Sequence, residues 1–247
     1  MPYLNSLASQ GGLATNYFGN AHPSIGNYFM LTTGVIESTD DAFAGTVSDD
    51  NIVRALSGAG KTWKAYFQSI PSQGYLGPDV YPYLRHHNPF SYFSDVQNSA
   101  AETANIVPLS QLAADMGANA LPAFAFIKAD VAHDAHDCPG GGETCADSDR
   151  LAAADAWLQQ NIDPLLKSQA FSGGVLIVTW DEGQPSDPAN GGGQVATVLV
   201  GNGVKAGFTS ATMFQHQSTL RLILDSLGVA DHPGASATAP SMSEFFQ

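Results

Sequence analysis

The chain has 247 residues and a formal net charge of −14 at pH 7, with nine Lys and Arg residues against 23 Asp and Glu. This length is enough to bury the core of one large α/β domain. So strong an acidity argues against nucleic acid as a partner and against docking on an anionic membrane. No apolar run reaches the length of a transmembrane helix, so we expect no stable membrane insertion.

Apolar periodicity predicts helices and strands that alternate along the chain. Because the strands are apolar on both faces, they indicate an α/β fold with a mostly parallel central sheet flanked by helices. No linker interrupts residues 1–247, which we expect to form a single domain. The expected helices are 3–10, 27–33, 52–59, 110–114, 148–166 and 218–227, the expected strands are 13–17, 61–69, 123–127, 175–179 and 194–201, and 71–89 is an expected loop.

Two acidic residues, Asp181 and Glu182, directly follow the apolar strand 175–179. Ligands of open α/β sheets bind beyond the carboxyl ends of strands. Two carboxylates at such a place require a positive partner, and a metal ion is the natural one. The alternative is a strand end that simply meets solvent.

Other polar clusters follow the neighbouring strands. Asp134 and His136 come after strand 123–127, and His216 comes after strand 194–201. Side chains at these strand ends are expected to converge on one crevice. Asp134 and His136 could bind a metal or orient a base, or they could belong to a solvated acidic loop.

Two further segments offer groups for an anionic ligand. Arg85, His87 and Asn88 form the densest cationic segment and could grip a phosphoryl group, or they could pair with surface acids. Ser24 lies in a turn just before the helix expected at 27–33, where free backbone N–H groups favour an anion or a nucleophile. Ser24 could equally be no more than the cap of that helix.

The two cysteines, Cys138 and Cys145, enclose a glycine-rich stretch. They could form a disulfide, which would imply an oxidising compartment, or remain free thiols. Residues 2–7 already have the character of domain sequence, so we expect no signal peptide within this chain.

The segment His22-Pro23-Ser24-Ile25-Gly26-Asn27-Tyr28, followed by Leu31-Thr32-Thr33-Gly34, resembles the nucleophile segment of a known family. This is the bacterial phosphoesterase family of acid phosphatases and non-specific phospholipases C, within the alkaline phosphatase-like superfamily. The resemblance extends from about Pro2 to the C-terminus. It includes, in the family's order, residues 62–66, 85–90, 134–137, 179–183 and 215–220.

The resemblance implies an alkaline phosphatase-like fold and the hydrolysis of phosphomonoesters, phosphodiesters or phospholipid headgroups. It implies that Ser24 attacks phosphorus and becomes transiently phosphorylated. It also implies a divalent metal on Ser24, Asp181 and Glu182, which could be Zn, Ca, Mg or Mn. The remaining candidates are Asn27 and His136 at the phosphoryl oxygens or leaving group, and Arg85, His87, Asn88 and His216 as substrate contacts.

One departure from the family affects the expected activity. The family normally begins with a strand that ends in Glu-Asn and completes the metal site, and this chain starts too late to contain it. We therefore expect a weaker metal site and an open position in the sheet, which another chain could cover in a homo-oligomer. The alternative function is a catalytically weak or inactive protein that binds anions or metal on the same fold. The family also suggests a secreted or periplasmic location.

Overall fold

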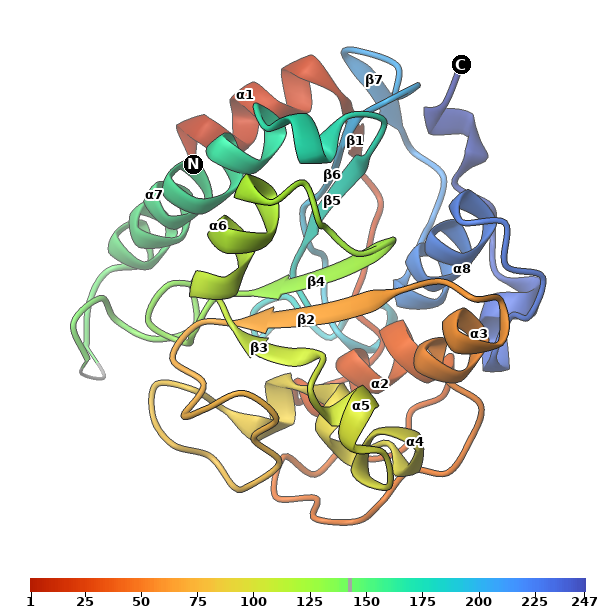
Figure 1. The fold of residues 1–247 in the computed structure, drawn as a ribbon. Helices are drawn as coiled ribbons and strands as arrows, with labels where there is room; N and C mark the ends of the chain where they lie inside the picture. The colour runs from red at the N-terminus through yellow and green to blue at the C-terminus, as the bar shows by residue number, and fades with distance from the viewer. Residues whose placement is uncertain (142–143) are drawn as a thin grey trace.

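The computed structural model describes residues 1–141 and 144–247, and it contains helices, strands and short 3₁₀ helices in an α/β arrangement (Figure 1). The α/β class is the one expected. The helices are α1 (Pro2–Gln10), α2 (Ile25–Thr33), α3 (Ile52–Gly58), α4 (Ser94–Gln97), α5 (Ala100–Thr103), α6 (Ser110–Gly117), α7 (Asp147–Leu166) and α8 (His216–Ser226). The strands are β1 (Gly12–Ala14), β2 (Trp63–Phe67), β3 (Ile106–Pro108), β4 (Phe124–Lys128), β5 (Val175–Thr179), β6 (Thr197–Gly201) and β7 (Phe208–Ser210).

The strands of the described residues form two sheets. The three-stranded sheet has the order β3-β2-β4 and is parallel throughout, as the apolar strands predict. The four-stranded sheet has the order β5-β6-β1-β7 and is mixed, because only β1 and β7 run parallel. We expected β5 to pair with parallel strands. This expectation is wrong, because among the described residues β5 pairs only with β6, and the two strands are antiparallel.

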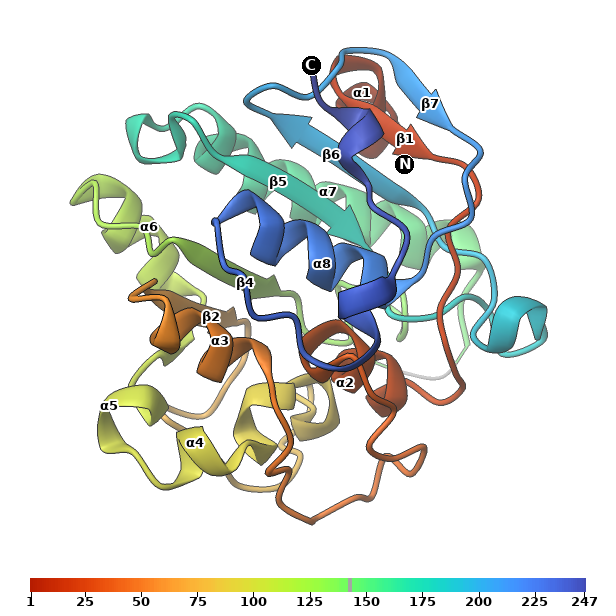
Figure 2. The ribbon, with the colours of Figure 1, turned by 90° about the vertical axis from the view of Figure 1, so that its right-hand side faces the viewer.

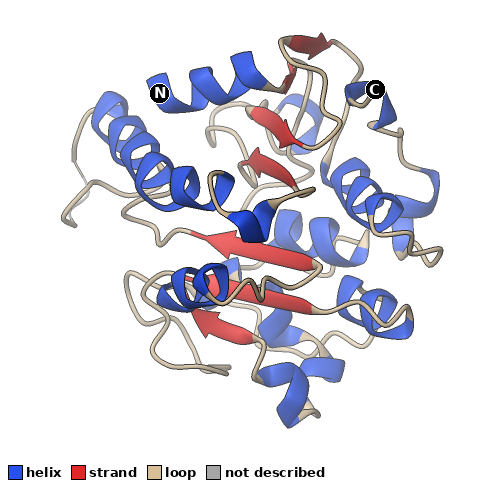
Figure 3. Cartoon of the chain, turned by 45° about the horizontal axis from the view of Figure 1, so that its top comes forward, coloured by secondary structure: helices blue, strands red, loops and turns tan. Residues whose placement is uncertain are grey.

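Helices cover both sheets (Figures 2 and 3). On one side, α8 and α3 pack with β2 in a cluster that includes Phe67, Phe90 and Leu220. On the other side, α7 packs with α1 and with β5 and β6 through Trp157, Leu7 and other apolar residues. This arrangement places the carboxyl end of β5 beside the start of α2, where the candidate nucleophile lies.

The ends of the helices agree only partly with the sequence-based expectation. Helix α2 ends at Gly34 as predicted, because φ of +71° at this position suits a residue without a side chain. Ser110 is not the N-cap of α6, and neither Ser148 nor Asp149 is the N-cap of α7. The N-caps are Leu109 and Ala146, without a side-chain cap bond, and the acidic first turn of α7 favours its N-terminus electrostatically instead.

Candidate active site

Ser24 lies immediately before α2 and is 4% exposed. Its hydroxyl makes no capping hydrogen bond to the helix backbone. Instead, Ser24 Oγ donates a hydrogen bond of 2.9 Å to Glu182 Oε1. The helix-cap alternative for Ser24 therefore fails, and the hydroxyl is directed to the carboxylate pair at the end of β5.

Glu182 is held from two sides. Its Oε1 accepts from Ser24, and its Oε2 pairs with Nδ1 of His22. The other ring nitrogen of His22, Nε2, contacts the carbonyl oxygen of Asp187 at 3.0 Å. Burial lowers the pKa of His22, but the contacts with Asp187 and Glu182 outweigh it and raise the pKa above its ordinary value. A charged imidazolium is thus favoured beside the Glu182 carboxylate.

Asp181 presents a carboxylate that the described residues leave incompletely paired. Its Oδ2 atom is buried and has no hydrogen-bond partner among them. Burial raises the pKa of Asp181 to about 6, although Lys128 and Ser24 act in the opposite direction. The solvent-facing alternative for this strand end therefore fails. A buried carboxylate oxygen without a partner is where a cation would be stabilised most.

Lys128 ends β4 and supplies the positive charge on the other side of the site. Its Nζ pairs with Asp134 and donates to the carbonyl of Ala129 at 3.1 Å. Asp134 also lies 3.8 Å from Nδ1 of His87, and its carbonyl accepts from Trp180 Nε1 at 2.8 Å. The loop after β4 is therefore fastened to the end of β5.

His87 and His136 approach this acidic group. His87 is buried, its ring lies 5.1 Å from that of Tyr28, and its Nε2 has no partner among the described residues. Burial, and after it the charge of Lys128, lowers the pKa of His87 well below its ordinary range. His136 lies 6.3 Å from His87 between ring centroids and is more exposed, with Nδ1 bonded to Asp137 at 2.7 Å.

Arg85 and Asn88 make local contacts within their own segment. The Arg85 guanidinium lies over the ring of Tyr92 at 4.2 Å and bonds to Ser91. Asn88 is fully buried and donates to the hydroxyl of Tyr83 at 2.9 Å. These interactions hold the loop together and do not direct the two side chains to Ser24. The expected contact of Arg85 and Asn88 with substrate stays a prediction.

Asn27 and His216 support the backbone around the site. Asn27 Oδ1 accepts from the N–H groups of Asn20 and Ala21 at 2.6 and 3.0 Å, which fixes the turn before Ser24. His216 is fully buried, and its Nε2 contacts the carbonyl of Asp181 at 2.5 Å. Burial lowers the pKa of His216 to about 4, so its ring is neutral at pH 7. Both residues also line the cavity beside the site, and their contact with substrate stays a prediction.

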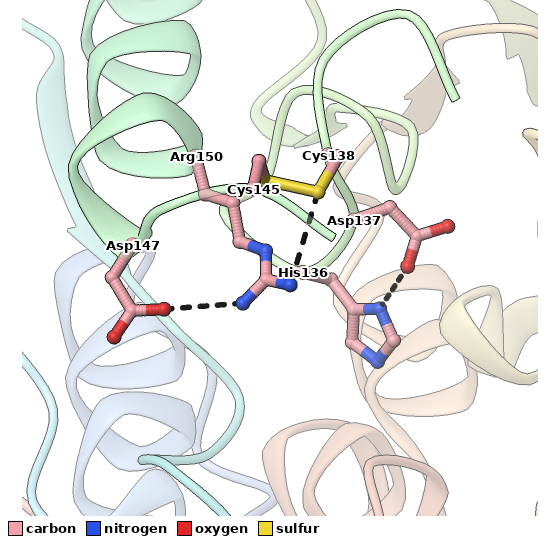
Figure 4. The surroundings of a disulfide bond; sticks show 6 residues. All are labelled: His136, Asp137, Cys138, Cys145, Asp147 and Arg150. Carbon is pink, nitrogen blue, oxygen red and sulfur yellow. Dashed lines mark hydrogen bonds and ion pairs between the residues drawn. A yellow bond between two sulfur atoms is a disulfide. The ribbon is translucent and has the colours of Figure 1, made fainter. Parts of the chain in front are cut away.

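Cys138 and Cys145 form a disulfide, so the free-thiol alternative fails (Figure 4). Arg150, in the first turns of α7, lies beside Cys138 Sγ and pairs with Asp147 at 3.1 Å. Asp147 in turn accepts from Gln184 at 3.2 Å, in the loop that follows Glu182. The disulfide loop is thereby linked to the start of α7 and to the carboxylate segment.

Sequence reasoning missed His22 and Lys128 as parts of the site. The signal for His22 is its position two residues before the nucleophile candidate. The signal for Lys128 is that it is one of few cationic residues and comes directly before an acidic cluster. Neither position reveals its partner, since His22 meets Glu182 160 residues further along the chain.

The described residues contain no group of three or more His, Cys, Asp or Glu side chains that could hold a metal ion. The donors that converge are Asp181, with its unpaired oxygen, Glu182 and the Ser24 hydroxyl. Three oxygen donors suit a hard divalent cation but leave most of its coordination positions to water or other groups. The residues present therefore have the right donor atoms for a divalent metal ion but supply only part of its coordination sphere.

The sequence pattern of the Phosphoesterase family matches residues 1–230, and the chain belongs to this family. It is 26% identical to a phosphatidylinositol-3-phosphatase of Mycobacterium tuberculosis, over 99% of this chain and 75% of that protein. It is 30% identical to a phosphate-repressible acid phosphatase of Penicillium chrysogenum, over 87% of this chain and 52% of that protein. The chain thus spans about half the length of this fungal relative.

The fold is similar to that of a protein in the alkaline phosphatase superfamily from Vibrio parahaemolyticus. The TM-score is 0.66 at 13% identity, covering 99% of this chain and 65% of that one. The expected family is confirmed, the chain is a member of a family of phosphoric ester hydrolases, and the expected alkaline phosphatase-like fold agrees with this likeness. Among the residues that the structure describes, no helix is long and apolar enough to cross a membrane.

Proposed function

We propose that residues 1–247 form one phosphoesterase domain that hydrolyses phosphate esters through a phosphoserine at Ser24, assisted by a divalent metal. The observation that carries this proposal is the hydrogen bond of 2.9 Å from Ser24 to Glu182, beside the unpaired carboxylate oxygen of Asp181. A hydroxyl in contact with a carboxylate can give up its proton as it attacks.

In the first step, Ser24 Oγ attacks phosphorus while its proton passes to Glu182. The bond from phosphorus to the ester oxygen breaks, and the leaving alkoxide takes a proton from Glu182 or solvent. In the second step, water attacks the phosphoserine, the bond from phosphorus to Oγ breaks, and Ser24 regains its proton as phosphate leaves. When bound on Asp181, Glu182 and Ser24, a divalent cation would stabilise negative charge on the Ser24 oxygen and on the phosphoryl group.

Both a small phosphate ester and a phospholipid headgroup are candidate substrates. The Mycobacterium tuberculosis relative is named for a phosphatidylinositol phosphate, and the Penicillium chrysogenum relative for acid phosphatase activity. The disulfide supports an oxidising location, such as the periplasm or the exterior of the cell.

The alternative function is the binding of anions or metal with little or no turnover. The absence of a three-residue metal group among the described side chains favours it. Calorimetry with inorganic phosphate tests it, since binding without hydrolysis of any ester under any added metal would support this alternative.

The direct test is acid quenching during turnover of p-nitrophenyl phosphate, with mass spectrometry to locate the phosphoryl group. We expect phosphate on Ser24, loss of turnover after chelation with recovery on adding metal, and loss of activity in Ser24→Ala. The matched control is Ser9→Ala, an exposed serine on α1. Bis-p-nitrophenyl phosphate, assayed in parallel, separates phosphodiesterase from phosphomonoesterase activity. Turnover that persists in Ser24→Ala would overturn the mechanism.

A further inference from the structure

The first turn of α2 receives a capping hydrogen bond from a residue outside the helix. A serine directly before a helix usually accepts a backbone N–H of the first turn with its own side chain. The Ser24 hydroxyl makes no such bond and is directed to Glu182. Instead, Asp41 Oδ1 accepts the backbone N–H of Ile25 at 3.1 Å. The cap of α2 thus comes from residue 41, and the Ser24 hydroxyl is left for Glu182.

The backbone N–H of Ile25 needs a partner of this kind. Ile25 is buried, with 1% of its surface exposed. The first N–H groups of a helix have no partner within the helix, and a buried N–H without a partner destabilises the fold. The helix dipole also favours a carboxylate at the N-terminus of a helix. Asp41 therefore stabilises the backbone at the residue that directly follows Ser24.

The chain after α2 folds back against the first turn of this helix. A Cβ atom at Gly26 would lie 3.1 Å from the carbonyl oxygen of Ser38, so the loop that leads to Asp41 packs closely on the helix where it begins. Two residues after Asp41, the ring of Phe43 lies 5.9 Å from that of Phe29 in α2, between ring centroids. The loop therefore packs on α2 both before and after Asp41, which fixes the position of the carboxylate.

A histidine of a second loop also approaches Asp41. His86 Nε2 lies 4.0 Å from Asp41 Oδ2, and His86 Nδ1 lies 3.2 Å from Asp79 Oδ2. Asp79 Oδ1 in turn accepts the backbone N–H of Arg85 at 2.5 Å. The His86 side chain is only 12% exposed. In Figure 1 the chain between α2 and α3 and the chain between β2 and α4 both lie at the lower end of the view, around α2. His86 therefore connects the loop that carries Asp41 with the segment 79–86.

Ser24 is thus held from three directions. Glu182 accepts the hydrogen bond of its hydroxyl, and Asn27 fixes the turn that precedes it. Asp41 fixes the backbone that follows it. The reacting atoms of an enzyme must be placed closely, since an error of about 1 Å can cost about 100-fold in rate. A group that fixes the backbone next to Ser24 can therefore influence the rate without contacting the substrate.

We propose that Asp41, supported by His86, is a positioning residue for the nucleophile, a role that rests on the proposed phosphoserine function. By fixing the backbone at Ile25, Asp41 directs Ser24 Oγ to Glu182 and to phosphorus. The role requires the acceptor oxygen of residue 41 and not its negative charge, which would repel a phosphate ester. A neutral side chain with the same acceptor should therefore replace Asp41, whereas a side chain without an acceptor should not.

Steady-state kinetics with p-nitrophenyl phosphate compare Asp41→Ala with Asp41→Asn. We expect kcat of Asp41→Ala to fall by roughly 10-fold or more, with little change in KM, because the loss affects the placement of Ser24 and not a contact with substrate. Asp41→Asn keeps an oxygen acceptor for Ile25 and should retain the wild-type kcat. The matched control is Asp40→Asn, at the neighbouring exposed acid, which should behave as the wild type. All assays are run well below the melting temperature of each variant.

Amide hydrogen exchange, followed by NMR without substrate, measures the cap itself. We expect exchange at the Ile25 amide to become faster by roughly 10-fold in Asp41→Ala and to stay unchanged in Asp41→Asn. The amide of Ala55, which donates to the carbonyl of Asn51 at the start of α3, is the internal comparison and should not respond. This measurement requires no turnover, so it is independent of the proposed function.

Three results would overturn the proposal. These are an unchanged kcat in Asp41→Ala, equal losses of kcat in Asp41→Ala and Asp41→Asn, and unchanged exchange at Ile25 in Asp41→Ala. A failure of the proposed function looks different, because the wild type would then show no turnover. That result would also remove the positioning role, while faster exchange at Ile25 in Asp41→Ala would still establish Asp41 as the cap of α2.

Discussion

Ser24 and Glu182, 158 positions apart in the chain, are joined by a hydrogen bond of 2.9 Å from hydroxyl to carboxylate. Ser24 is fixed by the start of α2, and Glu182 by the end of β5 and by His22. The nucleophile candidate and its carboxylate partner therefore lie close to the ends of two regular elements, Ser24 directly before α2 and Glu182 three residues after β5. Its orientation depends on how firmly Glu182 is held.

The contact between His22 and Glu182 predicts a positioning role. We expect His22→Phe to lower kcat by roughly 10- to 100-fold, because Glu182 loses the partner of its second oxygen. The melting temperature should change little, since His22 lies in a loop before α2. Steady-state kinetics measure the effect, and His232→Phe, at a surface histidine paired with Asp225, is the control. An unchanged kcat would show that Glu182 needs no support from His22.

Because the carboxyl group of Asp181 is buried, we expect it to lower the stability of the folded protein in a pH-dependent way. Burial raises its pKa to about 6 from 3.8, so the folded state holds this proton more tightly than the unfolded state does. The contribution of this bound proton to folding stability is complete below about pH 4, and it is lost as the pH rises through 6. In chelator, Asp181→Asn should therefore exceed the wild type in stability at pH 8, on the order of 3 kcal/mol, and the gap should close towards pH 4.

Urea unfolding of Asp181→Asn between pH 4 and 8 measures this difference. Asp231→Asn, at an exposed carboxylate, is the control variant and is measured in parallel. Asp181→Asn should also lose activity, since its unpaired oxygen is removed from the site. A stability difference that does not vary with pH would contradict the burial of a charged Asp181.

For His216 we expect the opposite dependence of stability on pH, over nearly the same pH range as for Asp181. Burial lowers its pKa to about 4, below the ordinary 6.5, so the unfolded state takes up this proton first as pH falls. Its contribution is present above about pH 6.5 and is lost as pH falls through 4, by roughly 3 kcal/mol. His216→Gln keeps a donor for the Asp181 carbonyl but cannot titrate.

We therefore expect the stability of His216→Gln to decline less steeply than that of the wild type between pH 6.5 and 4. Thermal unfolding at half-unit pH steps measures the two slopes. His136→Gln, at an exposed histidine, is the comparison variant and is measured in parallel. Parallel curves for His216→Gln and the wild type would mean that His216 is accessible to protons in the folded state.

The disulfide predicts a stability loss on reduction. Cys138 and Cys145 close a short loop, for which chain entropy gives roughly 2 kcal/mol. We expect reduced wild type and the Cys138→Ser, Cys145→Ser double variant to unfold at the same lower urea midpoint. Reductant should leave the double variant unchanged, which is the control. Activity should fall less than stability, because Ser24 and Glu182 touch neither cysteine. Equal urea midpoints for the oxidised and the reduced protein would contradict the expected loss of stability on reduction.

The local elements of the fold were largely predictable from the sequence. The apolar run of β5, the glycine that ends α2 and the periodicity of α7 each belong to one short segment, so their pattern is visible without the rest of the chain. The strands β3 and β7 were missed because each has three residues, too few to show a period. The antiparallel pairing of β5 was missed because it depends on β6, which comes after a long loop.

The candidate site was predictable in its residue types but not in its contacts. Asp181 and Glu182 follow a strong strand signal, and Ser24 precedes a helix. The division of labour between the acids, one paired and one unpaired, depends on His22 and Ser24 far away in sequence. Arg85 shows the converse, because a cation that suggested an anion site is held by Tyr92 and Ser91 in its own loop.

The half-exposed edges of β4 and β5 also govern how the protein behaves in concentrated solution. Edges that accept a foreign strand are the places where partly opened copies attach to one another and begin to aggregate. A net charge of −14 opposes this by repulsion between copies. Because the screening length falls from about 10 Å at 0.1 M salt to about 3 Å at 1 M, that repulsion weakens as salt is added. Dilute salt, rather than the concentrated salts used to precipitate proteins, is therefore the safer medium for storing this chain.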